Sequence, residues 1–271
     1  MTSPVIGAAL TNAELATYRD WVLERDRDPE LQSFVAAAVL DADWTPLADE
    51  VNRLLAGNTG RMGIHRPFWG ITNGTRDPLV RQVVQARLGQ GLDVCAAIDA
   101  SHLVIDSPFT TWDFDNLDAQ GGGRDQLFSS VHEVIYPIVK RAETLGVTLV
   151  MENIEDIDPS DRKTLCESFG SSALQLSIDT GHAHCAQGSN GAPPVDYFVR
   201  SAGDMLAQVH LQDADGYADR HWQIGQGTIL WPTVFAAIAD LNLAPRLVLE
   251  LRDTSGIPAS MAYLEAKGMG R

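Results

Sequence analysis

Short apolar segments alternate with helical segments along nearly the whole of this 271-residue chain, and this alternation restricts its fold more than any other feature. We predict eight strands, at Val5–Leu10, Glu30–Phe34, Met62–Pro67, His102–Ser107, Thr148–Asn153, Leu174–Asp179, Ala207–Leu211 and Arg246–Leu251. We predict eight helices, at Leu15–Arg25, Trp44–Leu55, Pro78–Ile98, Asp125–Leu145, Ser160–Glu167, Val195–Ser201, Trp231–Leu241 and Pro258–Lys267. Eight strands alternating with eight helices over about 250 residues is the pattern of an α/β protein with a (β/α)8 TIM barrel.

A doubly wound open sheet gives a similar alternation with fewer strands, so the two folds have to be distinguished. No G-x-G-x-x-G motif follows the first predicted strand, which removes the main support for a dinucleotide-binding sheet. Near-continuous apolar strands such as Leu247–Leu249 suit a parallel sheet that is covered on both faces. We therefore predict a single barrel domain over residues 1–271, with Gly121–Gly123 and Gln187–Pro194 as loops inside it.

The chain is acidic, with 36 Asp and Glu against 20 Lys and Arg and a formal net charge of -16. Because phosphate backbones are bound mainly through Lys and Arg, this balance argues against nucleic acid as a partner. No window approaches the roughly 18 consecutive apolar residues of a membrane span, and the first ten residues lack a signal-peptide pattern. Three widely spaced cysteines indicate free thiols in a reducing compartment, so we expect a cytoplasmic protein that does not engage membranes.

Six successive predicted strands end in a residue of a type that binds metals, namely His65, Asp106, Glu152, Asp179, His210 and Glu250. In a barrel the carboxyl ends of all strands converge on one face, where active sites lie. One such residue alone is more often a loop cap, but six at the same end indicate a shared site. Carboxylates gathered there repel one another unless a cation holds them ionised. Carboxylate and imidazole ligands together suit Mn²⁺, Zn²⁺, Fe²⁺ or Co²⁺ better than Ca²⁺.

A second set of ligand types follows close behind. Asp219 and His221 are two residues apart, so in an extended loop both side chains point the same way. His182 lies three residues after Asp179. Together these three residues suggest a further metal position, although a solvated loop explains the Asp-x-His pair equally well when it is taken alone.

The ordered motifs Val150–Asn153, Ile178–His182, Val209–Asp213, Asp219–Gly227 and Leu249–Glu250 resemble the xylose isomerase-like TIM-barrel superfamily. This superfamily contains sugar and sugar-phosphate isomerases and epimerases together with the apurinic endonuclease IV group. The resemblance implies that Glu152, Asp179, His210 and Glu250 form a shared metal site. It also implies that Glu152 and Glu250 are the catalytic acid and base, which move a proton on either side of an enediolate.

The endonuclease and epimerase branches of this superfamily imply different additional site residues. In endonuclease-type members, additional ligands match His65, His182, Asp219 and His221, so the chain is expected to bind one to three divalent ions. Their histidine at the end of the fourth strand is Asp106 here, which can still act as a ligand. Ketose 3-epimerases have a substrate-binding Arg at the position of Gly216. Candidate substrate-binding residues are therefore His182, Arg220, and the aromatic residues Trp69 and Trp112, whose rings can stack on a sugar.

Two activities remain compatible with these residues. The leading hypothesis is a metal-dependent isomerase or epimerase of carbohydrate metabolism that acts on a small sugar, polyol or sugar phosphate. The alternative is a multinuclear hydrolase of a small phosphate ester, with DNA the least suitable ester because of the acidic charge. A purely binding barrel is disfavoured because both Glu152 and Glu250 are present. The expected partner is a small molecule, and the sequence leaves the oligomeric state open.

Overall fold

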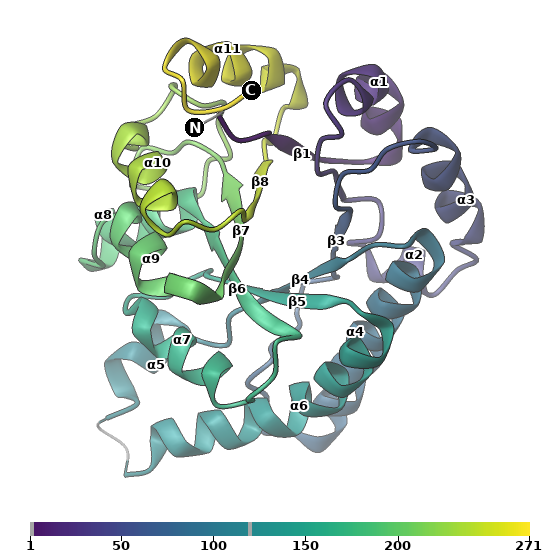
Figure 1. Cartoon of the computed structure of the whole chain (residues 1–271). Helices are drawn as coiled ribbons and strands as arrows, with labels where there is room; N and C mark the ends of the chain where they lie inside the picture. The colour runs from purple at the N-terminus through teal and green to yellow at the C-terminus, as the bar shows by residue number, and fades with distance from the viewer. Residues whose placement is uncertain (1–2, 119–120) are drawn as a thin grey trace.

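A computed structural model describes residues 3–118 and 121–271 and shows a closed barrel of eight parallel strands in sequence order (Figure 1). The strands are β1 (Gly7–Leu10), β2 (Glu30–Leu31), β3 (Gly63–His65), β4 (His102–Asp106), β5 (Thr148–Glu152), β6 (Leu174–Asp179), β7 (Leu206–Leu211) and β8 (Arg246–Leu249). The barrel closes where β1 pairs with β8, with Gly7 opposite Val248 and Ala8 opposite Leu249. The predicted (β/α)8 TIM barrel is thereby confirmed.

Helices surround the barrel on its outer side (Figure 1). They are α1 (Asn12–Leu23), α2 (Ala37–Leu40), α3 (Thr45–Leu54), α4 (Pro78–Ile98), α5 (Thr111–Asn116), α6 (Gly123–Leu145), α7 (Pro159–Glu167), α8 (Thr180–Asn190), α9 (Val195–Ala202), α10 (Trp231–Asp240) and α11 (Ile257–Ala266), with short 3-10 turns at Gly203–Met205 and Thr254–Gly256. Among the described residues no helix combines the length and apolarity that crossing a membrane requires.

Local sequence signals start several of these helices where the structure has them. Asp77 caps α4 by accepting hydrogen bonds from the amides of Leu79 and Val80, and Pro78 occupies the first helical position. Asp158 and Pro159 begin α7 in the same way. Asp179 caps α8 by accepting from the amide of His182, so the last residue of β6 also begins the next helix. This immediate strand-to-helix turn fixes His182 close to the strand ends.

The structure differs from the sequence prediction in several elements. We predicted Gln187–Pro194 as a loop, but α8 continues to Asn190. This prediction was wrong because the polar segment Thr180–Asn190 has no clear apolar period, whereas its Asp179 cap and Gly191 terminator define a helix. The predicted Gly121–Gly123 loop ends earlier, since Gly123 begins α6. The short helices α2 and α5 were not predicted, and β2 is only two residues long.

The two ends of the barrel carry different cavities. At the amino ends of the strands lies a cavity of about 1000 Å³ with a largely apolar lining, including Phe235, Leu243 and Met269. At the carboxyl ends lies a smaller cavity of about 490 Å³ that is lined by Glu152, His182, Asp219, His221 and Glu250, among others. Most of the metal-binding residues predicted from the sequence therefore line the smaller cavity.

Candidate metal centre

Four side chains from neighbouring strand ends meet beside the smaller cavity, which two of them line, and we call them the deep group. They are Glu152, Asp179, His210 and Glu250, and one ligand atom of each lies within 4.8 Å of those of the others. Glu152 and Asp179 are the last residues of β5 and β6, and His210 lies directly opposite Asp179 on β7. Glu250 follows β8, with its amide donating to the carbonyl of Leu211 at 3.1 Å. The parallel register of the barrel thus brings the deep group together.

Three buried polar atoms of the deep group make no hydrogen bond to the rest of the described chain, namely Oε2 of Glu152, Oδ2 of Asp179 and Nδ1 of His210. Oε2 of Glu152 and Nδ1 of His210 instead form an ion pair with each other, whereas Oδ2 of Asp179 has no partner among the described residues. An unpartnered buried polar atom costs about 1–3 kcal/mol, and more when the group is charged. Together with Glu250 these residues are a donor set that a divalent cation satisfies, because carboxylate oxygen and imidazole nitrogen are both ligands of Mn²⁺, Zn²⁺, Fe²⁺ and Co²⁺. The residues present therefore fit a metal ion.

The pKa values of the deep group also favour a bound cation. Burial opposes ionisation of Glu152, but the neighbouring histidines in their protonated form, His210 first, lower the pKa of Glu152 to about 2. Burial, reinforced by the charge of Glu152, raises the pKa of Asp179 to about 6. Burial disfavours the charged form of His210, yet Glu152, Glu250 and Glu30 raise its pKa well above its usual value. Without a metal, protons on imidazoles balance the carboxylates, and a bound divalent ion would release them.

A second set of ligand types, which we call the outer group, lies above the deep group and consists of His182, Asp219 and His221. His182 lies in the first turn of α8, and the other two lie in the long loop between β7 and α10. Nδ1 of His182 contacts the carbonyl of Asn153 at 2.9 Å, and Nδ1 of His221 contacts the carbonyl of Glu250 at 3.0 Å. Because a carbonyl can only accept, each Nδ1 carries the proton, and each Nε2 is left facing Asp219.

The outer group is more exposed than the deep group and is already paired internally. The Asp219 side chain is 45% exposed, and Nε2 of His221 lies 3.1 Å from its carboxylate. Burial opposes its ionisation, but hydrogen bonds from His182 and His221 lower the pKa of Asp219 well below its usual range. Burial lowers the pKa of His221 less than Asp219 and Glu250 raise it, so its pKa is raised to about 9. This arrangement has the geometry of a second cation site, but its atoms are not left unpartnered.

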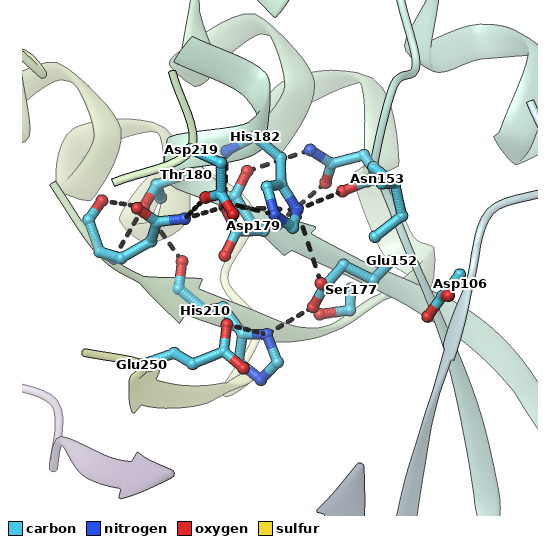
Figure 2. Close-up of polar contacts among 12 residues, drawn as sticks. Asp106, Glu152, Asn153, Ser177, Asp179, Thr180, His182, His210, Asp219 and Glu250 are labelled. Carbon is cyan, nitrogen blue, oxygen red and sulfur yellow. Dashed lines mark hydrogen bonds and ion pairs between the residues drawn. The ribbon is translucent and has the colours of Figure 1, made fainter. Parts of the chain in front are cut away.

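Gln212 connects the two groups. Its Nε2 donates to Asp179 at 3.1 Å and to Asp219 at 3.0 Å, and its Oε1 accepts from the amide of His221 at 2.8 Å. A side chain at Gly181 would collide with this amide, because an added Cβ would lie 2.1 Å from Gln212 Cδ. The glycine of the Thr180-Gly181-His182 motif therefore makes room for the bridge. Figure 2 shows His182 and Asp219 of the outer group close to Asp179, with His210 and Glu250 of the deep group below them.

The structure places two further predicted ligands outside both groups. His65 is buried at the end of β3, with Nδ1 at 2.8 Å from the carbonyl of Arg66, and its ring stacks with that of His210 at 6.4 Å between centroids. Asp106 forms an ion pair with buried Arg66 at 3.0 Å, and Figure 2 shows it apart from the deep group. Both residues line the smaller cavity. They lie at its wall, and the geometry brings neither into a group that could share one ion.

The predicted substrate-binding residues are divided between the cavity and the surface outside it. His182 and Trp69 line the cavity, and Trp69 is 81% exposed at its rim. Trp112 lines a different depression with Thr72 and Arg76, so the structure does not place it at the metal centre. Arg220 pairs with Asp215 at 2.8 Å, contacts the Trp222 ring and does not line this cavity. It lines a neighbouring depression together with His221 and Arg252, and its contact with substrate stays a prediction.

Several residues that shape the centre were not predicted from the sequence. Glu30, Gln32 and Gln212 contact the predicted ligands directly. The Asn153 side chain bridges the ends of β5 and β6 by donating to the carbonyl of Asp179 and accepting from its amide. Glu30 gave a usable signal, since it is an acidic residue beside Leu31 at the start of a predicted strand. Gln32 and Gln212 are neutral and gave none.

Comparison with known proteins identifies what this chain resembles. A sequence model of the family described as "Xylose isomerase-like TIM barrel" matches residues 29–267. The TTHB071 protein from Thermus thermophilus, studied after soaking with ZnCl2, has a similar structure with a TM-score of 0.73 and 25% identity, covering 98% of this chain and 99% of that one. A D-tagatose 3-epimerase-like protein has a TM-score of 0.77 at 17% identity, covering 97% and 96% of the two chains.

A D-psicose 3-epimerase, crystallised in the presence of D-fructose, has a TM-score of 0.68 at 15% identity and is covered over its whole length. At this level of identity the likeness is one of fold. Among curated sequences, the chain is 24% identical over 185 residues to the uncharacterized protein MJ1311 of Methanocaldococcus jannaschii, with 66% of this chain and 60% of that protein aligned. The uncharacterized protein MJ1614 of the same organism is 21% identical over 170 residues, covering 61% of each. The chain thus spans about three fifths of the curated relatives it matches.

Proposed function

The chain belongs to the xylose isomerase-like TIM barrel family, and on that basis we propose that it is a divalent-metal-dependent sugar isomerase or epimerase. The proposed reaction moves a proton at the carbon beside a carbonyl, through an enediolate. The observation that carries the proposal is the deep group, in which Glu152, Asp179 and Glu250 gather around His210 with ligand atoms within 4.8 Å of one another. The sugar epimerases among the similar structures support the same reaction class.

Glu152 and Glu250 are proposed as the acid and base. They approach the deep group from β5 and from the loop after β8, and both face Nδ1 of His210, with Oε2 of Glu250 at 3.4 Å. A divalent ion held by the deep group would polarise a carbonyl and its adjacent hydroxyl, which would make the proton on the hydroxyl-bearing carbon removable. One carboxylate accepts that proton, and the other, in its protonated form, returns a proton to the reacting carbon or its oxygen.

The cavity lining favours an uncharged sugar over a phosphorylated one. Five carboxylates line it, namely Glu14, Asp106, Glu152, Asp219 and Glu250. Among the described lining residues, Arg252 is the one permanently charged cation, and its Nη2 already donates to the carbonyl of Asp219 at 3.3 Å. A phosphate dianion entering this cavity would be repelled unless additional cations accompanied it. We therefore propose small neutral ketoses or polyol-derived ketones as the substrate class.

One observation favours a second candidate, a multinuclear hydrolase of a small phosphate ester. The outer group presents two Nε2 atoms and one carboxylate, and both imidazoles are oriented by backbone carbonyls, as is common for metal-binding histidines. Such a hydrolase needs ligands for more than one ion, and the outer group would supply them. The number of ions bound per chain separates the two candidates, because one ion favours the isomerase and two or three favour the hydrolase.

The experiment that tests the leading proposal is deuterium exchange. Protein loaded with Mn²⁺, Co²⁺ or Zn²⁺ is incubated in D2O with a panel of neutral ketoses, and exchange at the carbon beside the carbonyl is followed by NMR. We expect exchange with at least one ketose and a roughly 10²–10⁴-fold loss in Glu250→Gln, the range typical for removing a general acid or base. The matched control is Glu265→Gln, the same chemical change at an exposed position of α11, which should exchange at the wild-type rate.

The opposite result is equally clear. Turnover of p-nitrophenyl phosphodiesters by the metal-loaded protein, without exchange into any ketose, would overturn the isomerase proposal in favour of the hydrolase. Undiminished exchange in Glu250→Gln would remove Glu250 from the proton transfer.

A further inference from the structure

We propose that Glu30, at the start of β2, is a positioning residue that fixes which ring nitrogen of His210 is offered to a metal ion in the deep group. Glu30 is completely buried and does not line the cavity, so it cannot touch substrate. This inference rests on the proposed function only in that the deep group binds a divalent ion.

The contact between the two residues is direct and nearly symmetric. Nε2 of His210 lies 3.0 Å from Oε1 and 3.1 Å from Oε2 of Glu30. An ionised carboxylate only accepts hydrogen bonds, so Nε2 carries a proton toward Glu30. Nδ1 contacts Oε2 of Glu152 and lies 3.4 Å from Oε2 of Glu250, so this is the side on which a divalent ion would replace a ring proton. With Nε2 keeping its proton, Nδ1 is then the nitrogen that offers its lone pair to the ion. A carboxylate behind a ligating imidazole is a known way to orient the ring and strengthen its donor nitrogen.

Gln208 and Arg246 hold the carboxylate of Glu30 in position. Nε2 of Gln208 donates to its Oε2 at 2.9 Å, and Nη1 of Arg246 lies 3.7 Å away. Arg246 is completely buried and donates to Oε1 of Gln208. Gly63 on β3 makes room for this arginine, because an added Cβ would lie 2.3 Å from its Nη1. Burying a carboxylate costs free energy unless it is paired. Here Arg246 supplies the countercharge and Gln208 supplies a hydrogen bond.

Gln208 also lies close to His210, with 2.9 Å between the two Nε2 atoms. If the Gln208 amide donated to His210, the ring proton would be on Nδ1 and the ring could not bind a metal through that atom. The structure favours the other assignment, because Gln208 Nε2 has an acceptor in Glu30 at the same distance, and a carboxylate is the stronger acceptor. Removing Glu30 therefore removes the group that decides between the two ring forms.

The same residue reaches the second proposed proton-transfer carboxylate. Nε2 of Gln32 lies 3.2 Å from Oε1 of Glu30 and 3.2 Å from Oε1 of Glu250. Glu30 therefore connects, through one side chain each, to the histidine and to the glutamate that complete the deep group. A change at Glu30 should disturb metal binding before it disturbs the barrel, because β2 pairs with β1 and β3 through backbone atoms.

The test compares wild type with Glu30→Gln, an isosteric change that allows the amide to donate as well as accept. Co²⁺ binding is measured by calorimetry and by its visible absorption spectrum, with Glu265→Gln as the surface control. We expect a 10–100-fold weaker Co²⁺ affinity in Glu30→Gln, the range typical for losing an oriented partner behind a ligand. The spectrum should also change, because the imidazole donor is altered, and Glu30→Asp should recover part of the affinity.

Thermal melting separates positioning from a purely structural role. A structural role lowers the melting temperature equally with and without Co²⁺, whereas a positioning role reduces the increase that Co²⁺ produces. If Glu30→Gln proves unfolded, ¹⁵N NMR of the wild-type protein with Zn²⁺ decides the question. We expect a protonated Nε2 and a metal-bound Nδ1 at His210.

Different results would overturn the inference about Glu30 and the proposed function. Wild-type affinity, spectrum and melting increment in Glu30→Gln, or a protonated Nδ1 at His210, would overturn the inference while leaving the metal site intact. A wild-type protein that binds no Co²⁺ or Zn²⁺ at the deep group would overturn the proposed function itself.

Discussion

The deep group and the outer group both consist of carboxylate and imidazole side chains, but they differ in burial and in the balance of these charges. The deep group is built on strand ends, is almost completely buried and gathers three carboxylates around the single imidazole of His210, which forms an ion pair with Glu152. The outer group is built mainly on a loop, is partly exposed, and has two imidazoles for one carboxylate, with His221 at 3.1 Å from Asp219. Three mostly buried carboxylates with one imidazole lack countercharge and need a cation, whereas one partly exposed carboxylate with two imidazoles does not.

This difference suggests an order of binding. The deep group should gain the most from an ion, because its three mostly buried carboxylates share one imidazole as countercharge. The outer group is more exposed and already has two imidazoles for one carboxylate, so it should bind an ion more weakly or only together with a substrate oxygen. If this holds, the chain acts with one resident ion, which suits the isomerase, and the outer group contacts substrate.

Of the variants that test this difference, Asp179→Asn should reduce metal binding the most. Asparagine caps a helix about as well as aspartate, so α8 should survive, while the ligand charge is lost. We expect metal affinity at the deep group to fall by about 100-fold or more, beyond the range for residues behind the ligands. Calorimetry with Mn²⁺ measures this, and circular dichroism checks the fold. Unchanged affinity would show that Asp179 is only a helix cap.

His182→Ala should have an intermediate effect. It removes one Nε2 from the outer group and leaves all four ligands of the deep group in place, so the deep group should keep its ion with affinity within about threefold of wild type. Exchange or turnover should fall by roughly 10–100-fold through a higher KM, because the substrate loses a contact. Elemental analysis alongside kinetics tests this. If the wild type binds two ions and His182→Ala binds only one, the result would favour the hydrolase instead.

Gln212→Met should have a smaller effect, because it breaks the bridge between the groups and removes no ligand. Methionine has a similar length and cannot donate to Asp179 or Asp219, so the loop at His221 should become less ordered. We expect activity to fall about 3–10-fold with the ion of the deep group retained, as for the milder losses of an outer partner. Loss of both ions or of all activity would mean that the two groups act as one centre.

Arg220→Gln should have the smallest effect. Arg220 pairs with Asp215 outside the cavity, and a partly exposed ion pair contributes roughly 0–1 kcal/mol. We expect KM and kcat within about twofold of wild type, in contrast to what a substrate-binding arginine would produce. Steady-state kinetics measures this, and a KM rise of tenfold or more would restore Arg220 to the substrate site.

The fold could be predicted from the sequence because each part of a barrel repeats the same local pattern. Strands such as Thr148–Glu152 are apolar runs of predictable length, and helices such as Pro78–Ile98 begin at Asp-Pro signals. The rule that the carboxyl ends of barrel strands share one face then brings the strand-end residues together. Helix α8 was missed because its helical character comes from its cap and terminator, and apolar periodicity is absent.

The candidate site was less predictable where loops and interior polar residues decide the geometry. Sequence order could not show that Asp215 forms an ion pair with Arg220, or that Arg66 forms one with Asp106 at the cavity wall. Glu30 lies about 180 positions from His210, so only the closed barrel brings the two together. Residues whose role depends on a partner from a distant strand leave little trace in a single sequence.

Anomalous diffraction from a crystal grown with a slight molar excess of Mn²⁺ would locate the resident ion without relying on any activity. We predict one strong peak within roughly 2–2.5 Å of ligand atoms of Glu152, Asp179, His210 and Glu250, with the outer group weaker or empty. A peak at the outer group with none at the deep group, or no peak at either, would show that the deep group is not the metal centre.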